Sequence, residues 1–173
     1  MPKTGMEPIR REALVQAAIA EIGDAGSLDV TVGRIARRAG VSPALAHHYF
    51  GGKEQIFLAA MRRILSDYGR AVRAALGAAG THRDRLAAIL RASFAPENFG
   101  EAAIGAWLNF YVLARVNPEA RRLLAVYQAR LRSNLLHELR PLLGDGAGEA
   151  ARSIAAMIDG LYLRAALGGP DAP

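Results

Sequence analysis

The stretch from Thr31 to Lys53 reads TVGRIARRAGVSPALAHHYFGGK and contains no aspartate or glutamate. Its charge of +4, within a net charge of +6 for the whole chain, comes from four side chains: Arg34, Arg37, Arg38 and Lys53. Two short helical patterns flank the turn 40–43, which is the sequence form of a helix-turn-helix. Positive charge in such a motif attracts the phosphate backbone of nucleic acid, so the stretch predicts DNA binding.

The residues around the turn favour this interpretation. Thr31 and Ser42 are predicted N-caps, and Pro43 suits a first helical position because its missing N–H costs nothing there. Gly40 suits a turn that requires a positive φ. We expect the helix from Pro43 to Phe50 to enter the major groove with its N-terminal turn leading.

The candidate DNA contacts fall into two groups. Small, apolar or histidine side chains on the second helix would contact base edges, and these are Pro43, Ala44, Leu45, His47 and His48. Residues that would bind phosphate and set the register are Thr31, Arg34, Ser42, Tyr49 and Lys53. The alternatives are a solvated basic surface and a histidine metal pair. Because neighbouring residues on a helix point about 100° apart, two adjacent histidines make a poor metal site, and we expect no metal.

The same residues resemble the N-terminal signature of tetracycline-repressor-type (TetR) regulators. The resemblance is carried by Thr31-Val32, Ile35-Ala36, Ala39-Gly40-Val41-Ser42, His48-Tyr49-Phe50 and Lys53-Glu54. It implies an all-α, dimeric, ligand-responsive transcriptional regulator, usually a repressor. Ala46 stands where a larger aliphatic residue is common, and His47 stands where tyrosine is frequent, so the resemblance does not give the operator sequence.

The rest of the chain is also helical in pattern. Half of its 173 residues are apolar, alanine and leucine dominate, and no period-two strand pattern occurs. We predict an all-α fold with an N-terminal DNA-binding domain, 1–52, containing the helix-turn-helix at about 31–50. A larger ligand-binding and dimerisation domain, 53–173, follows. The predicted helices are about 8–24, 31–40, 43–50, 53–76, 83–94, 101–116, 118–143 and 148–167, with a turn at 96–100.

Several function classes are disfavoured by composition. The chain has no cysteine, no glycine-rich phosphate loop and no supported catalytic triad, so we expect neither an enzyme nor a cofactor. The polar N-terminus lacks a signal-peptide pattern, and the longest apolar run, 102–114, is too short to span a bilayer. We therefore expect a soluble, cytoplasmic protein. A membrane-surface role is a weaker alternative, because the charge surrounds a turn rather than one face of a long helix.

Further patches resemble the branch of this family that represses glycine-betaine synthesis genes in response to choline. They are Met1-Pro2-Lys3, Gly5-Met6, Ile9-Arg10-Arg11, Ala106-Trp107-Leu108, Ile158-Asp159-Gly160-Leu161 and Ala166-Leu167. This resemblance implies repression of glycine-betaine synthesis and choline uptake genes, with release from the operator by choline or a related cation. The alternative is a repressor of the same family that responds to a different small molecule.

The candidate ligand residues lie in the second domain. Trp107, Phe110 and Tyr111 share one helix face, and Tyr162 and Asp159 lie on the last helix. Aromatic faces bind quaternary ammonium groups by cation–π attraction, but an aromatic stripe is also what a plain core shows. A buried Asp159 needs a partner, which could be a cationic ligand, Arg152, Arg164 or a helix N-terminus.

The last helix also carries an apolar stripe wide enough for a helix–helix interface: Ile154, Met157, Ile158, Leu161 and Ala165. The family resemblance implies a homodimer formed by a four-helix bundle of the last two helices of each subunit. We interpret the chain as ending, at Pro173, after one of these helices. On that interpretation either the sequence is shortened or the interface is built differently.

Overall fold

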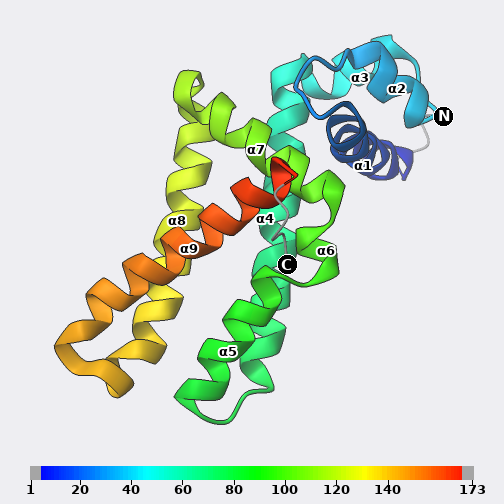
Figure 1. Ribbon diagram of the computed structural model, residues 1–173. Coiled ribbons are helices and arrows are strands. Elements are labelled where there is room, and N and C mark those ends of the chain that lie inside the picture. Colours follow the sequence, from blue (N-terminus) through cyan, green and yellow to red (C-terminus); the bar gives the residue numbers. More distant parts are fainter. Residues whose placement is uncertain (1–4, 169–173) are drawn as a thin grey trace.

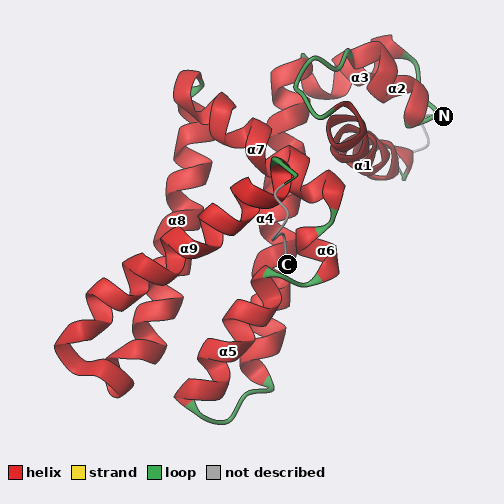
Figure 2. Ribbon diagram, in the orientation of Figure 1, coloured by secondary structure: helices red, strands yellow, loops and turns green. Residues whose placement is uncertain are grey.

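The computed structural model of the protein describes residues 5–168, and its regular elements there are all helical (Figures 1 and 2). The all-α prediction is confirmed. The patch Met1-Pro2-Lys3 lies outside the described residues. The helices are α1 Met6–Ala25, α2 Val32–Arg38, α3 Pro43–Phe50, α4 Lys53–Gly77, α5 His82–Ser93, α6 Pro96–Phe99, α7 Glu101–Val116, α8 Pro118–Leu143 and α9 Ala147–Ala166, with a 3-10 turn η1 at Gly144–Gly146.

The predicted caps set the ends of the short helices. The Thr31 hydroxyl accepts a hydrogen bond from the Arg34 backbone N–H, and the Ser42 hydroxyl accepts one from Leu45 N–H, both at 3.2 Å. Gly40 has φ +68°, so the turn between α2 and α3 uses the left-handed conformation that favours glycine. These contacts satisfy backbone donors that a helix start leaves without partners.

Helices α1, α2 and α3 form a small unit, called here the head, at the N-terminal end of the long helix α4 (Figure 1). Ile35, Ala36 and Ala46 are fully buried where α2 and α3 meet, and Leu14 from α1 is buried in the same core. Helix α4 starts in contact with the head and continues down the body, with Phe57 among its buried residues. One core therefore runs from the head into the body.

The body, α4–α9, is built around long helices, and α8 and α9 are its last two (Figure 1). They are joined by η1 and pack against each other as an antiparallel pair. This corrects the interpretation that the chain ends after one long C-terminal helix, because α8 is itself the penultimate helix. The predicted turn at 96–100 contains the single-turn helix α6, which Pro96 starts.

Candidate DNA-binding head and ligand site

Helix α3 presents an open face away from the core of the head. Ala46 is fully buried, whereas Pro43, Ala44, His47 and His48 are exposed. Leu45, also a predicted base contact, is half-buried. The helix thus packs on the core through Ala46, with Tyr49 and Phe50 partly buried beside it, and leaves four of the five predicted base-reading side chains at the surface.

The C-terminal end of α3 is held by a cation from α1. The Arg11 guanidinium lies 5.2 Å from the ring centre of Tyr49 and 5.3 Å from that of Phe50. Cation–π contacts of this kind stabilise a surface by about 0.5–1 kcal/mol each. At the start of α4, the Lys53 ammonium lies 5.6 Å from the Phe57 ring centre. Tyr49 and Lys53, both predicted phosphate contacts, are therefore half-buried and packed within the protein.

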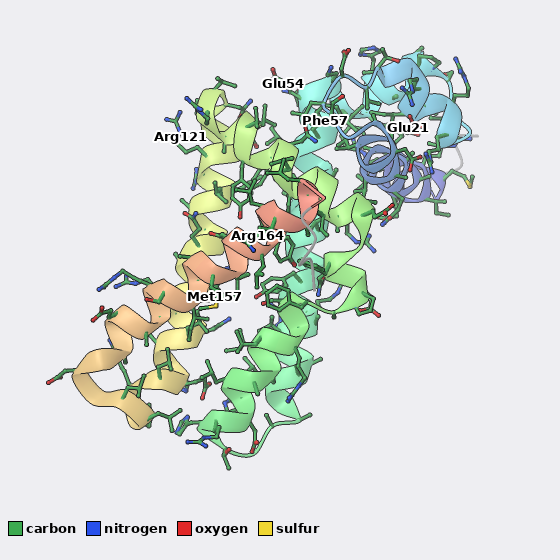
Figure 3. All side chains as sticks on the ribbon, viewed as in Figure 1. Glu21, Glu54, Phe57, Arg121, Met157 and Arg164 are labelled. Carbon is green, nitrogen blue, oxygen red and sulfur yellow. The ribbon has the colours of Figure 1, made fainter. Side chains whose placement is uncertain are left out.

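Acidic residues of α1 pair with the arginines of α2. Glu21, which is 8% exposed, forms ion pairs with Arg34 at 2.9 Å and with Arg38 at 3.2 Å. Arg38 also reaches Asp24, and the hydrogen bonds to Asp24 and Glu21 raise the pKa of its guanidinium. Figure 3 shows Glu21 inside the head, between these elements. The acid-free stretch is thus partly neutralised by carboxylates from outside it, which reduces the positive charge available to DNA.

In the body, aromatic rings from several helices gather around Trp107. Its ring centre lies 4.8 Å from that of Tyr127, 5.8 Å from Tyr111 and 6.1 Å from Tyr162. Tyr68 of α4 meets Tyr127 edge-on at 5.7 Å. We call Tyr68, Trp107, Tyr111, Tyr127 and Tyr162 the aromatic cluster.

Asp159 places a carboxylate against this cluster. The Tyr111 hydroxyl donates a hydrogen bond to Asp159 Oδ1 at 2.9 Å, joining α7 to α9. Burial raises the pKa of Asp159, and burial together with the nearby carboxylate raises the pKa of Tyr111. Arg152 and Arg164, the expected protein partners, are exposed, and within residues 5–168 Asp159 has no ion pair. The carboxylate is therefore held by one neutral hydroxyl, without a cation.

Two of the predicted ligand residues also have structural contacts. Phe110 is 1% exposed and lies behind Trp107, with ring centres 6.0 Å apart, so it belongs to the core. The Tyr162 hydroxyl donates to the Ser93 carbonyl at 2.5 Å and reaches the Asn98 carbonyl at 3.1 Å. Its ring faces the cluster while its hydroxyl fastens α9 to the end of α5.

The sequence did not identify Tyr68 and Tyr127 as members of this cluster. They lie on α4 and α8, and the spacing along one helix gives no information on which side chains of another helix it meets. A tyrosine at a half-buried helical position was the available signal, but such residues are common in plain cores.

The body and the head also meet through α7. A β-carbon built on Gly105 of α7 would lie 3.5 Å from the Gly23 Cα atom of α1. Because Gly105 is two residues before Trp107, the helix that carries Trp107 and Tyr111 of the aromatic cluster lies directly on the head.

Neither a metal site nor a membrane span is found among the described residues. Across residues 5–168 no group of three or more histidine, aspartate or glutamate side chains could hold a metal ion. In the same part of the chain, no helix is long and apolar enough to cross a membrane.

Both parts of the chain match known protein families. Residues 14–60 match the family "Bacterial regulatory proteins, tetR family", and residues 82–173 match "BetI-type transcriptional repressor, C-terminal". The regulator BetI of Brucella anthropi is 53% identical over 174 residues, covering 100% of this chain and 89% of that protein. BetI of Rhizobium meliloti is 54% identical over 168 residues, covering 96% of this chain and 83% of that protein.

Solved structures show the same fold. A putative regulator from Saccharomonospora viridis, determined in complex with choline, has a TM-score of 0.87 and 24% identity, covering 96% of this chain and 90% of that one. A putative regulator from Pseudomonas aeruginosa PAO1 has a TM-score of 0.81 and 29% identity, with 96% and 84% coverage. The relatives are regulators, in agreement with the expectation that this chain is not an enzyme. The protein belongs to the TetR family of DNA-binding transcriptional regulators, in its BetI-type repressor branch.

Proposed function

We propose that the protein is a homodimeric repressor of glycine-betaine synthesis and choline uptake genes, released from its operator by choline or a related quaternary ammonium cation. The observation that supports a cationic effector is the environment of the Asp159 carboxylate. It accepts a hydrogen bond from Tyr111, a member of the aromatic cluster, and has no ion-pair partner among the described residues. A bound cation would neutralise this carboxylate.

The aromatic cluster suits a quaternary ammonium group in particular. Ring faces attract a cation without needing hydrogen-bond donors, and a quaternary ammonium has none to offer. Trp107 gives the strongest face, and the Tyr127 ring lies 4.8 Å from it. Asp159 adds a negative charge whose burial is costly until a cation arrives. A structural neighbour determined in complex with choline supports this assignment.

For DNA binding, we propose that α3 enters the major groove. Pro43, Ala44, His47 and His48 are exposed on it and would contact base edges, with Leu45 at the margin. Thr31 and Ser42 begin α2 and α3, where backbone N–H groups attract phosphate. Arg34, Tyr49 and Lys53 complete the phosphate contacts, and Arg34 would then share its charge between Glu21 and the DNA.

The dimer would form through α8 and α9. Met157 and Leu163 of α9 are 62% and 47% exposed, and Leu143 at the end of α8 is 51% exposed. Figure 3 shows Met157 and Arg164 on α9, and both side chains are exposed. Exposed apolar side chains on an adjacent antiparallel pair favour burial against a second copy related by two-fold symmetry.

The effect of ligand binding would be transmitted to the head through α7. Trp107 and Tyr111 lie on this helix, and Gly105 of the same helix contacts α1 at Gly23. A cation that draws α7 and α9 together would shift α1, and with it the spacing of the two α3 helices in the dimer. The effect on DNA affinity equals the difference in choline affinity between the two arrangements.

Fluorescence anisotropy with an operator selected from random duplexes tests the proposal. We expect millimolar choline to weaken operator binding, while ethanolamine, which lacks the three methyl groups, has at least about tenfold less effect. Without ligand, log K should fall with log salt with a slope of roughly −5 to −9 if both protomers contact the backbone. Release by an unrelated ligand, with choline inert, would disprove the choline assignment and leave the family unchanged.

A further inference from the structure

A long cleft lies between α4 and α8, next to the aromatic cluster. It has a volume of about 510 Å³, which is within the range of small-molecule sites. Along α4 it extends from Arg62 to Leu76, and the 14 residue steps between them span roughly 21 Å. Its shape therefore suits an extended molecule rather than a compact one.

The walls of the cleft are largely apolar. They are formed by aliphatic side chains from both helices: Leu65, Val72, Leu76, Leu123, Val126 and Leu131. The rings of Tyr68 and Tyr127 form part of the same lining. Val126 is 42% exposed here, so covering these walls would remove apolar surface from water.

The charges that line the cleft are all positive. Its charged residues are Arg62, Arg73 and Arg130, and no carboxylate is among its lining residues. Arg62 is neutralised by an ion pair with Glu119. Neither Arg73 nor Arg130 has an ion pair with any residue in the described range 5–168.

The register of the two helices brings these two arginines to within about 3 Å of the same level along the helix axes. The contacts Arg62–Glu119 and Tyr68–Tyr127 show that α4 and α8 run in the same direction. Arg73 is then roughly 7.5 Å beyond Tyr68, and Arg130 roughly 4.5 Å beyond Tyr127. Gly69 leaves space on α4 for the Arg73 guanidinium, whose Nη1 would lie 3.4 Å from a β-carbon added there. Two unpaired cations therefore border one apolar cleft, where an anion would relieve their repulsion.

We propose that this cleft is a second ligand site, for an amphipathic anion with a chain-like apolar body and a carboxylate. The chain would lie along the leucine and valine walls, and the carboxylate would bind Arg73 and Arg130. Arginine suits this role because its planar group binds a carboxylate through two parallel hydrogen bonds. The site differs from the aromatic cluster in the sign of its charge, and it shares with the cluster only the rings of Tyr68 and Tyr127.

Titration of the full chain with laurate, below its micelle-forming concentration, tests the site. The readout is fluorescence of Trp107, the single tryptophan, which contacts Tyr127 at the cleft wall. We expect saturable laurate binding, weakened at least about tenfold in the double variant Arg73→Gln/Arg130→Gln. All four arginines are exposed, but Arg70 and Arg132 are not among the residues that line the cleft. The control Arg70→Gln/Arg132→Gln therefore removes the same charge from the same helices outside the cleft and should bind as the wild type does.

Dodecanol and Asp159→Asn complete the design. Dodecanol has the same chain without the charge and should bind at least about tenfold more weakly than laurate. Asp159→Asn should leave laurate binding intact, because that carboxylate is not part of the cleft. The proposal is wrong if laurate does not bind, if it binds no better than dodecanol, or if both double variants bind it equally. Thermal unfolding of each variant checks that the fold is retained.

Discussion

Gly23 of α1 and Ala102 of α7 lie in direct contact where the head meets the body: a β-carbon built on Gly23 would lie 2.4 Å from the Ala102 Cα atom and 2.6 Å from its Cβ. The two helices therefore meet without a side chain from α1 between them. Packed backbones of this kind do not compress, so a shift of α7 must displace α1. This contact links the head to the helix that carries the proposed ligand residues Trp107 and Tyr111.

Replacing Gly23 by alanine should destabilise the protein. The added methyl would overlap the α7 backbone, and the helices would have to separate, at a cost of about 1–3 kcal/mol. The control is Gly77→Ala at the end of α4, where an added β-carbon meets nothing within 4 Å. Urea unfolding should give Gly23→Ala a clearly lower free energy of unfolding than Gly77→Ala. Equal free energies would show that α1 and α7 can separate at Gly23 without cost.

Glu21→Gln should loosen α2 from α1, because it leaves Arg34 without a charged partner and Arg38 with Asp24 alone. Both guanidinium groups are about half exposed, so we expect a loss of about 1–2 kcal/mol, below the 3–5 of a fully buried pair. The freed charge should make the salt dependence of duplex binding steeper, by roughly one unit of slope per protomer. Glu119→Gln, which breaks an exposed pair with Arg62, is the matched control and should change stability by less than about 0.5 kcal/mol. An unchanged salt slope in Glu21→Gln would mean that Arg34 and Arg38 stay away from DNA.

Asp159→Asn should stabilise the protein while weakening choline binding. The amide oxygen can still accept the Tyr111 hydrogen bond, but the buried charge is gone. Isothermal titration should show at least about a tenfold loss of choline affinity, whereas Asp145→Asn in the exposed turn η1 should bind normally. Retained choline affinity in Asp159→Asn would place the cation elsewhere.

The same carboxylate gives choline binding a defined pH dependence. Burial raises the pKa of Asp159 above its ordinary 3.8. As the pH falls through this raised pKa, the folded protein takes up a proton before the unfolded chain does, so unliganded stability increases while choline affinity declines. Calorimetric titrations at successively lower pH should show the decline in the wild type, and its absence would contradict an ionised Asp159 at the site.

Glu138 of α8 should make the stability of the protein depend on pH in the acidic range. It is 1% exposed and accepts hydrogen bonds from His82 at 2.7 Å and Arg85 at 2.8 Å. Burial alone would raise its pKa, but these two partners bring it below the ordinary 4.5. Its contribution to stability is therefore present above pH 4.5 and is lost as the pH falls through the lower folded-state pKa.

Glu138→Gln should cost about 1–3 kcal/mol at neutral pH and should reduce the loss of stability on acidification. Urea midpoints at pH 7 and pH 4 measure both effects. The exposed Glu149→Gln of α9 is the control and should follow the wild type. A wild-type acid dependence in Glu138→Gln would show that other carboxylates dominate.

Local features of the fold were predictable because they depend on neighbours in the chain. The caps Thr31 and Ser42, the glycine turn at Gly40 and the stop at Gly26 act within a few residues of themselves, and the structure has each of them. Helix bounds shifted by one or two residues, as in α1, which begins at Met6 rather than Pro8. Helix ends depend on weak local preferences, and such shifts are expected.

Contacts between distant segments were not predictable in the same way. The Glu21 ion pairs cross from α1 to α2, so the charge of the stretch 31–53 overstated what is free to bind DNA. Tyr127 reaches Trp107 only through the packing of α8 on α7, which no periodicity in one helix specifies. The apolar cleft with Arg73 and Arg130 depends on the same packing.

Operator binding measured in the presence of choline, for the wild type and for Asp159→Asn side by side, tests the central claim most directly. The claim is that a quaternary ammonium cation bound at Asp159 releases the head from DNA. We predict that saturating choline weakens the operator complex of the wild type at least about tenfold and that of Asp159→Asn by less than about twofold. Equal release of both proteins, or no release of either, would contradict it.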